Sequence, residues 1–548
     1  MSAPSIPAGA DRSSPPPPPS PPPAPVDAAH DPQRHRGAPH KYLIALAVVM
    51  ASMIYVIDSS IVNVALPDMM GNLGASLDEI AWVSTGYILA TVVIIPMTGW
   101  LGSFFGRKRY FVSSVLIFTA ASFLCGQAHS LAMLITARVI QGVGGGALMT
   151  VSQAVLFESF PIEEAGTAMA LFGLGVMVGP TIGPTLGGYI TDHYSWPWIF
   201  YINVPVGLVA AFMIATYVHD SPHQQRTRNV DAIGIALLVV SVGAVQYVLE
   251  QGQRFDWFNS GTINTLIVVG IVGGVALLWR ELTIERPVID FRVLRHRQVW
   301  VGTLLGVVMG VGLYASVFTL PVFLQGDLHM TAEQTGLILL PGSAATAVAM
   351  AVIGRINRYV DPRLMVSLGA LLFAASMWQL AHITSDSGAG DFFWPLILRG
   401  GGLGLMFVPL TTVTLAGLPT EDLPQGTGLY NFFRQLGGSF GIAIFATMVE
   451  HYTVSVRSLL GEHVSLSDPN TVARLHQLTA GMMAQSGDPV AAQRQALQLL
   501  DAEMTGQASV IAFSRVYLLA AVLVLSLIPL LLLIRKADVL ESEGMLME

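Results

Sequence analysis

Long apolar runs separated by short polar connections dominate the chain. A membrane-spanning helix needs about 20 mostly apolar residues, and the backbone groups of a span must be hydrogen-bonded within a helix or a closed barrel. The runs are continuously apolar rather than alternating, which favours helices. The pattern therefore predicts an all-α integral membrane protein with fourteen transmembrane helices, at residues 42–66, 79–101, 110–127, 131–157, 166–190, 198–218, 231–250, 262–279, 299–324, 332–354, 364–384, 392–416, 426–448 and 510–534.

Composition argues against a soluble protein. Hydrophobic residues make up 53% of the 548 residues and charged residues only 11%, whereas soluble domains carry roughly 25% charged residues. The single cysteine, Cys125, rules out a disulfide framework or a cysteine metal site. The histidines show no metal-ligand spacing and the basic residues form no single patch, so we expect no metal, no other cofactor and no nucleic-acid partner.

The distribution of Lys and Arg predicts the orientation. An even number of spans puts both termini on one side of the membrane. With that side in the cytoplasm, nineteen of the 27 Lys and Arg residues lie inside, four lie outside, and four fall within or at the ends of spans. Cytoplasmic loops are enriched in these residues. We therefore expect a multi-pass protein of the inner membrane with both termini in the cytoplasm.

An internal repeat predicts the domain organisation. "AGTAMALF" (165–172) aligns with "QGTGLYNF" (425–432), and "VIQGVGGGALM" (139–149) aligns with "ILRGGGLGLMF" (397–407), at separations of 260 and 258 residues. The second alignment sets Gln141 opposite Arg399. Two six-helix halves, 41–219 and 283–535, then flank two inserted helices within 220–282. Duplicated halves are typical of transporters that bind substrate between them near the membrane midplane.

Three segments lie outside the predicted spans. Residues 1–40 include "SSPPPPPSPPPAP" and are predicted to form a disordered, Pro-rich cytoplasmic tail, and residues 536–548 a short C-terminal tail. A long loop at 449–509 contains two segments that open with Asp-Pro, a helix-start pattern, so we expect two short amphipathic helices outside the membrane. This loop is either a solvated cap or a docking surface for a periplasmic partner.

Asp58 is the only formal charge between Tyr42 and Leu66. A bare charge at the bilayer centre costs about 2.5–3.5 kcal/mol on insertion scales. Arg138 begins another apolar span and needs a counter-charge, and Asp58 is the leading candidate. Asp58 lies 17 residues after Lys41, about 25 Å at the helical rise, a depth compatible with contact. The pair is interpreted as a proton-binding site or as a structural ion pair without proton cycling.

A second pattern lies in the span at 166–190, where glycines recur every four residues on one helix face. Small residues in that register allow helices to pack closely, and prolines beside them remove backbone hydrogen bonds and favour a bend. The residues of this pattern are Gly175, Gly179, Pro180, Gly183, Pro184, Gly187 and Gly188.

Two enzyme-like patterns fail on context. "GGSFG" (437–441) fits a hydrolase motif that needs a strand–turn–helix setting, but it lies in a predicted span. "GVGGGA" (142–147) lacks the preceding strand of a dinucleotide site. The chain has no Walker motif, so we expect neither an enzyme nor direct drive by ATP.

Several segments, in order, resemble the fourteen-span drug:proton antiporter family of the major facilitator superfamily, of the EmrB/QacA type. They are "IDSSIVNVALP" in span 1, Arg138…Gln141-Gly142 in span 4, the antiporter motif "GPTIGPTLGGYI", "WPWIFYINVPVG", "RFDWF" and "NFFRQLGGSFG". The similarity covers roughly residues 42–535. In the loop between spans 2 and 3, Gly99, Gly106 and Arg107 match the family, but Ser103 replaces the Asp that relatives use in a cytoplasmic latch.

The resemblance implies proton-driven multidrug efflux by alternating access, and hence antibiotic resistance, with small amphipathic substrates and membrane lipid as partners. It also implies a periplasmic adaptor (a membrane fusion protein) and an outer-membrane channel. Candidate substrate-cavity residues are Gln141, Tyr314, Arg399 and Arg434. The family often has Gln where Arg399 stands, and the extra cation favours an alternative, an exporter of anionic amphiphiles such as fatty acids or bile acids. A non-exporting uniporter or importer is a further alternative.

Overall fold

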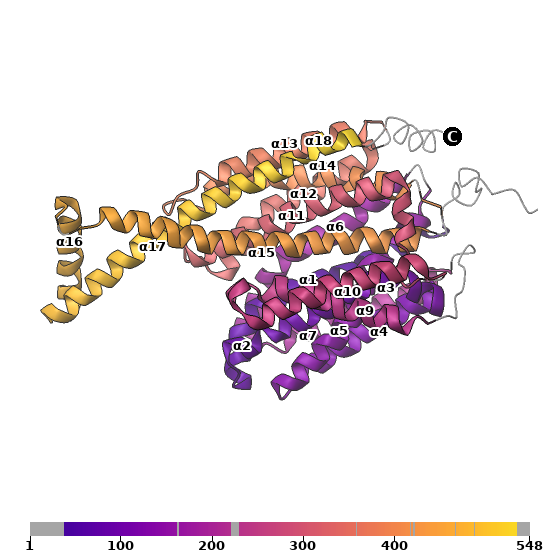
Figure 1. The fold of residues 1–548 in the computed structure, drawn as a ribbon, viewed down its shortest axis with the longest axis horizontal. Coiled ribbons are helices and arrows are strands. Elements are labelled where there is room, and N and C mark those ends of the chain that lie inside the picture. Colours follow the sequence, from indigo (N-terminus) through magenta and orange to yellow (C-terminus); the bar gives the residue numbers. More distant parts are fainter. Residues whose placement is uncertain are drawn as a thin grey trace, which may run out of the picture.

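A computed structural model describes residues 38–161, 164–220, 230–285, 287–357, 359–416, 418–419, 422–465, 467–486 and 488–533. The predicted Pro-rich tail lies outside these ranges except for residues 38–40, and the predicted tail at 536–548 lies outside them as well. Across the described ranges the secondary structure is helical (Figure 1).

The first half comprises α1 (Lys41–Leu73), α2 (Leu77–Ile80), α3 (Trp82–Phe105), α4 (Arg107–Gly126), α5 (Leu131–Ser159), α6 (Ala165–His193), α7 (Trp198–Tyr201) and α8 (Asn203–Tyr217). Two inserted helices follow, α9 (Ala232–Gln251) and α10 (Gly261–Thr283), separated by η3 (Trp257–Asn259). The second half comprises η4 (Phe291–Arg295), α11 (Arg297–Gly326), α12 (Ala332–Ile356), α13 (Pro362–Leu380), η5 (Ala389–Phe392), α14 (Phe393–Ala416), α15 (Leu423–His463), α16 (Pro469–Ser486), α17 (Pro489–Leu525), α18 (Leu527–Leu530) and η6 (Leu531–Leu533).

Thirteen helices in the described part of the chain are long and apolar enough to cross a membrane. They correspond to thirteen of the fourteen predicted spans. The remaining prediction, 166–190, falls on α6, a helix of 29 residues whose apolar stretch is the shorter segment Ala165–Val176. The predicted class, an all-α multi-pass membrane protein, is confirmed.

The main hydrophobic core runs through both halves. In the first half α1 packs on α6, α5 and α8, while α3 and α4 pack on α5. In the second half α11 packs on α15, and α14 packs on α12 and α13. The halves meet where α6 lies against α12 and where α3 lies against α15. A Cβ atom on Gly166 of α6 would lie 2.8 Å from the carbonyl oxygen of Gly354 on α12, so the two backbones are nearly in contact.

The inserted pair contacts both halves. α9 and α10 pack on each other, and α9 also contacts α3 and α15. Gln251 donates from Nε2 to Oγ1 of Thr85 on α3 at 2.9 Å, and Gln246 donates from Nε2 to Oγ of Ser439 on α15 at 3.0 Å. α9 is therefore hydrogen-bonded to both halves.

The predicted pair of short helices in the 449–509 loop is partly wrong. α15 runs unbroken for 41 residues and α17 for 37, so both extend beyond the other helices, and only α16 is a separate short helix, lying across their tips (Figure 1). No proline interrupts the chain between 449 and 463, so nothing ends α15 at the expected boundary. We call α16 and the extended parts of α15 and α17 the projection.

Side-chain contacts hold the projection together. Ala492 and Ala496 of α17 are fully buried, which allows its neighbours to approach closely. Arg457 of α15 pairs with Asp501 of α17 at 2.5 Å, and Arg474 of α16 pairs with Glu503 of α17 at 2.5 Å. The second Asp-Pro segment therefore opens a long spanning helix rather than an isolated one.

Candidate functional site

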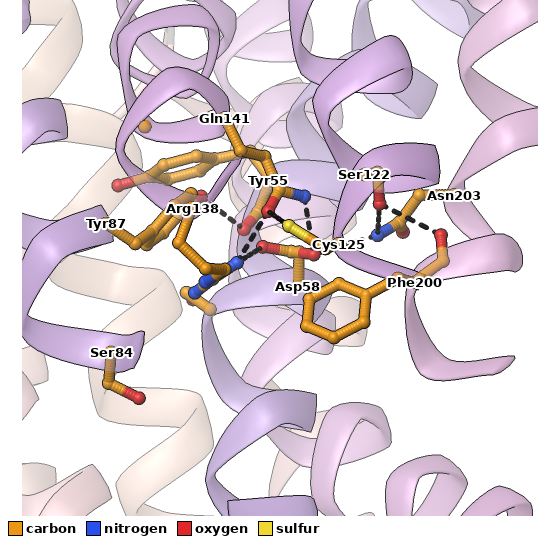
Figure 2. Close-up of polar contacts among 12 residues, drawn as sticks. Tyr55, Asp58, Ser84, Tyr87, Ser122, Cys125, Arg138, Gln141, Phe200 and Asn203 are labelled. Carbon is orange, nitrogen blue, oxygen red and sulfur yellow. Dashed lines mark hydrogen bonds and ion pairs between the residues drawn. The ribbon is translucent and has the colours of Figure 1, made fainter. Parts of the chain in front are cut away.

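Asp58 of α1 lies in a fully buried polar cluster (Figure 2). Its Oδ2 accepts from Nη1 of Arg138 at 2.6 Å. Its Oδ1 accepts from Nε2 of Gln141 at 2.8 Å and from Nδ2 of Asn203 at 2.9 Å. The carboxylate thus has one cationic and two amide donors, supplied by α5 and α8.

Arg138 is satisfied on more than one side. Its Nε donates to the carbonyl oxygen of Val83 at 3.0 Å, and its Nη1 also donates to Oε1 of Gln141 at 2.8 Å. Its guanidinium carbon lies 4.0 Å from the centre of the Tyr87 ring, a cation–π distance. Only 1% of the residue is exposed, so the charge is balanced within the first half.

A further layer of contacts holds the donors in place. Asn203 also donates from Nδ2 to Oγ of Ser122 at 3.1 Å, and Ser122 donates to the carbonyl oxygen of Phe200 at 2.9 Å. The Cys125 thiol donates to Oε1 of Gln141 at 3.6 Å. The sequence analysis singled out neither Ser122 nor Asn203, although Asn203 lies within the family segment "WPWIFYINVPVG".

The Asp58 cluster connects three helices through one buried carboxylate. A buried ion pair is stable only while both charges and their hydrogen bonds are in place. A proton on Asp58 removes its attraction for Arg138 and leaves an uncompensated guanidinium. The Asp58 carboxylate therefore joins α1 to α5 and α8.

The glycine face of α6 packs directly on α1, the helix that carries Asp58. A Cβ atom on Gly175 would lie 3.1 Å from Oγ of Ser52, and one on Gly179 would lie 2.6 Å from Cγ1 of Val56. A Cβ atom on Gly187 would lie 2.8 Å from Cγ1 of Ile61.

The other residues of the glycine pattern on α6 differ in their surroundings. A Cβ atom on Gly183 would overlap Oγ of Ser60, which donates to the carbonyl oxygen of Gly179 at 3.3 Å. The side chain of Pro180 lies outside the described part of the chain, while Pro184 is half-buried and Gly188 is buried. α6 continues as one helix through both prolines, and its glycines are required for close approach to α1.

The loop between spans 2 and 3 lies at the C-terminal end of α3. Gly106 forms the turn from α3 into α4 with φ +91°, a conformation that favours glycine. Arg107 pairs with Glu158 of α5, while Ser103 donates to the carbonyl oxygen of Gly99 at 3.0 Å. Glu158, the acid that pairs with Arg107, thus comes from α5, and sequence analysis did not single it out.

The same end of α3 lies against the second half. A Cβ atom on Gly99 of α3 would lie 2.7 Å from Cδ of Gln425 on α15. We call this the Arg107 end of the bundle.

Comparison with known proteins identifies the family. Residues 48–442 match the family model for the Major Facilitator Superfamily. The chain belongs to this superfamily. It is 35% identical to the multidrug export protein EmrB of Escherichia coli (strain K12) over 89% of this chain and 94% of that protein. It is 32% identical to the fatty acid resistance protein FarB of Neisseria gonorrhoeae, over the same shares of the two chains. These relatives place it among the EmrB-type exporters of the superfamily.

The fold has a counterpart among solved structures. The crystal structure of the human organic anion transporter MFSD10 (TETRAN) superimposes with a TM-score of 0.56, over 89% of this chain and all of that one. The sequence identity is 13%, so the likeness concerns the fold alone.

The four residues predicted to line a substrate cavity come from four helices of this major facilitator protein, α5, α11, α14 and α15. Gln141 belongs to the Asp58 cluster. Arg399 of α14 donates from Nη1 to the carbonyl oxygen of Ser316 on α11 at 3.3 Å. Tyr314 of α11 donates to Oε1 of Gln435 at 2.9 Å. Arg434, the neighbour of Gln435 on α15, lies between the halves.

The aligned positions Gln141 and Arg399 have similar surroundings, since each contacts the first helix of its own half. Ser316 follows Asp58 by 258 residues, the same interval that separates Arg399 from Gln141. The second half therefore carries a serine where the first carries the carboxylate. The two halves of this protein therefore differ at this pair of equivalent positions, since Asp58 in the first half corresponds to Ser316 in the second.

Proposed function

We propose that this protein is a proton-coupled exporter of amphipathic toxic compounds that works by alternating access. The observation that carries the proposal is the Asp58–Arg138 pair, fully buried and joined at 2.6 Å on helices that pack around the centre of the first half. Buried ionisable pairs within membrane segments are expensive and mark ion or proton pathways. The printed name of EmrB, multidrug export protein, supports the choice of substrate.

Proton binding alters how α1 is held. In the charged form Arg138 ties α1 to α5 through Asp58, while the glycine face ties α1 to α6. A proton taken up by Asp58 weakens the first tie and leaves the second, which depends on packing alone. The gradient then favours the conformation that best accommodates a neutral Asp58, and release of the proton on the other side restores the pair.

Alternating access requires the halves to separate at one end at a time. At the Arg107 end they are in close contact, because a Cβ atom on Gly428 of α15 would lie 3.2 Å from Oγ1 of Thr98 on α3. Gly99 and Gln425 make a second contact there. We propose that these contacts break when the Arg107 end opens to load substrate. The Lys and Arg residues near this end support a cytoplasmic assignment in the inner membrane.

The projection is the proposed docking surface for a periplasmic adaptor that continues the path to an outer-membrane channel. It carries exposed apolar side chains outside the bundle, among them Val454 (65% exposed), Leu459 (54%) and Val490 (60%). Apolar side chains clustered on a helical surface favour protein contact. This surface lies at the end opposite the Arg107 end, where an exported compound leaves.

Transport by the Asp58→Asn variant tests the proposal. Asparagine keeps the size of the side chain and one acceptor oxygen, but it has neither the charge nor the titrating proton. In vesicles with an imposed pH gradient, we expect the variant to lose gradient-driven accumulation of a fluorescent amphiphile. Asp386→Asn, an exposed loop position, is the matched control and is expected to transport like wild type. Wild-type transport by Asp58→Asn would falsify the proposal.

A second candidate function is export of anionic amphiphiles. The printed name of FarB, a fatty acid resistance protein, is consistent with it. The structural feature that favours anionic substrates is the environment of Arg434.

A further inference from the structure

Arg434 is a buried cation without an anion. Only 1% of the residue is exposed. Its Nη2 donates to Oδ1 of Asn431 at 3.0 Å and lies 3.8 Å from Sδ of Met149. Its Nε and Nη1 have no hydrogen-bond partner among the described residues. No carboxylate in the part of the chain that the structure describes forms an ion pair with it.

The unused donors are numerous. Nε carries one N–H bond and Nη1 carries two, so three donors of this guanidinium lack an acceptor. Buried donors without acceptors are destabilising, and the penalty is greater for a charged group. A thioether sulfur such as that of Met149 is a weak acceptor that a stronger one readily displaces.

The position of Arg434 is at the division between the halves. It lies on α15, and its neighbour Met149 lies on α5 of the first half. Asn431, one turn earlier on α15, donates from Nδ2 to Oε1 of Gln153, also on α5. These contacts must separate whenever the halves move apart here, so the unused donors become available when the transporter opens.

The surroundings suit the rest of an amphiphile. The guanidinium carbon lies 5.7 Å from the ring centre of Phe407, and Met149 is 1% exposed. Tyr314 and Gln435 provide hydrogen-bonding groups beside this apolar surface. A charged donor at the edge of an aromatic and thioether surface matches a ligand with an anionic head and an apolar tail.

We infer that Arg434 binds the anionic head group of exported amphiphiles, with a carboxylate as the preferred head. The inference rests on the proposed transport function and names its substrate class. A carboxylate offers two oxygens in the geometry that a guanidinium recognises. Arg138 differs from Arg434, because its Nε and Nη1 already donate to Val83, Asp58 and Gln141 and its charge is paired with the Asp58 carboxylate.

Equilibrium binding to purified protein tests the inference. The probes are dodecanoate, dodecanol and dodecyltrimethylammonium, which share a tail and differ in head-group charge. Protein in lipid nanodiscs at neutral pH, without a proton gradient, is titrated with each probe by calorimetry. We expect Arg434→Gln to weaken dodecanoate binding by about tenfold or more, the loss typical of a charge-assisted hydrogen bond, and to leave dodecanol binding within about twofold. Arg434→Lys is expected to fall between wild type and Arg434→Gln.

Two further variants distinguish Arg434 from the other cations of the second half. Arg457→Gln removes an exposed cation from the same helix and is expected to bind all three probes like wild type. Arg399→Gln removes a second buried cation. Loss of dodecanoate preference in Arg399→Gln but not in Arg434→Gln overturns the assignment, as does an equal loss for all three probes in Arg434→Gln. Since no gradient is present, these results do not depend on whether Asp58 carries protons, which the transport assay decides.

Discussion

Arg138 and Arg434 are both 1% exposed, yet the two halves of the molecule treat them differently. In the first half the guanidinium of Arg138 faces a carboxylate, a carbonyl, an amide and an aromatic ring. In the second half Arg434 has one amide oxygen and a thioether, and two of its nitrogens have no acceptor among the described residues. Burial alone therefore does not define the role of a membrane arginine. A guanidinium that is neutralised within one half stabilises that half. A guanidinium that has no counter-charge and lies between the halves is available to a ligand.

Removing Arg138 gives the largest expected effect. Arg138→Met leaves the Asp58 carboxylate buried without its counter-charge, so we expect the free energy of unfolding to fall by about 3–5 kcal/mol. The measurement is thermal and denaturant unfolding in detergent. The double variant Asp58→Asn with Arg138→Met removes both charges and is expected to regain most of the loss. A double variant as unstable as the single one would mean that the ion pair is not the source of the effect.

A substitution in the glycine face of α6 tests whether close packing of α6 on α1 is needed to hold Asp58 beside Arg138. Gly179→Ala places a methyl group 2.6 Å from Cγ1 of Val56, and overpacking of this kind costs about 1–3 kcal/mol. Gly274→Ala is the matched control, since no atom lies within 4 Å of its added Cβ. The added methyl group would also lie 2.8 Å from Cβ of Val56, so only Val56→Gly removes both contacts. We expect Gly179→Ala together with Val56→Gly to be more stable than Gly179→Ala alone and to regain gradient-driven transport. Failure of the double variant to improve on Gly179→Ala contradicts the packing argument.

Removing Arg434 is expected to change stability in the opposite direction. Arg434→Met replaces an incompletely satisfied cation with an apolar side chain of similar length, which we expect to raise the free energy of unfolding by about 1–2 kcal/mol. The same unfolding measurement, compared directly with Arg138→Met, provides the contrast. Destabilisation as large as that of Arg138→Met would show that Arg434 also has a structural role.

The smallest expected effect lies in the projection, far from both arginines. Asp468 accepts hydrogen bonds from the backbone N–H and the hydroxyl of Thr471 at 2.9 and 2.7 Å, and these bonds lower the pKa of its carboxyl. Its contribution is therefore present above the ordinary pKa of Asp and is lost as the pH falls through the lowered value. Asp468→Ala is expected to weaken the start of α16, because an N-terminal cap of this kind stabilises the first turn of a helix. Hydrogen exchange should rise in α16 and not in α5, and equal exchange in variant and wild type would refute the capping role.

The amino-acid pattern predicted much of this molecule for identifiable reasons. Apolar runs determine spanning helices, and a lone acid and a lone arginine in such runs have few available partners, so Asp58 and Arg138 were paired correctly. Asn203 was missed although it lies in the segment "WPWIFYINVPVG", because a single amide beside an apolar run gives no indication of its partner. Glu158 was missed because the family pattern directs attention to position 103, where this chain has serine.

Other features depend on tertiary packing. The continuation of α15 and α17 beyond the bundle depends on contacts between helices far apart in sequence, including Arg457 with Asp501. Arg434 matches a family segment and Arg399 does not, but the contacts of the two side chains are visible only in the folded chain. Arg399 faces a carbonyl within its own half, and Arg434 faces the opposite half.

The inserted helices have a mechanical consequence. α9 is anchored through Gln251 to α3 and through Gln246 to α15. Any displacement of one half relative to the other must either break one of these bonds or drag α9 along. α9 is thus a covalently continuous link between the two halves, and each of its two amide hydrogen bonds connects it to a different half.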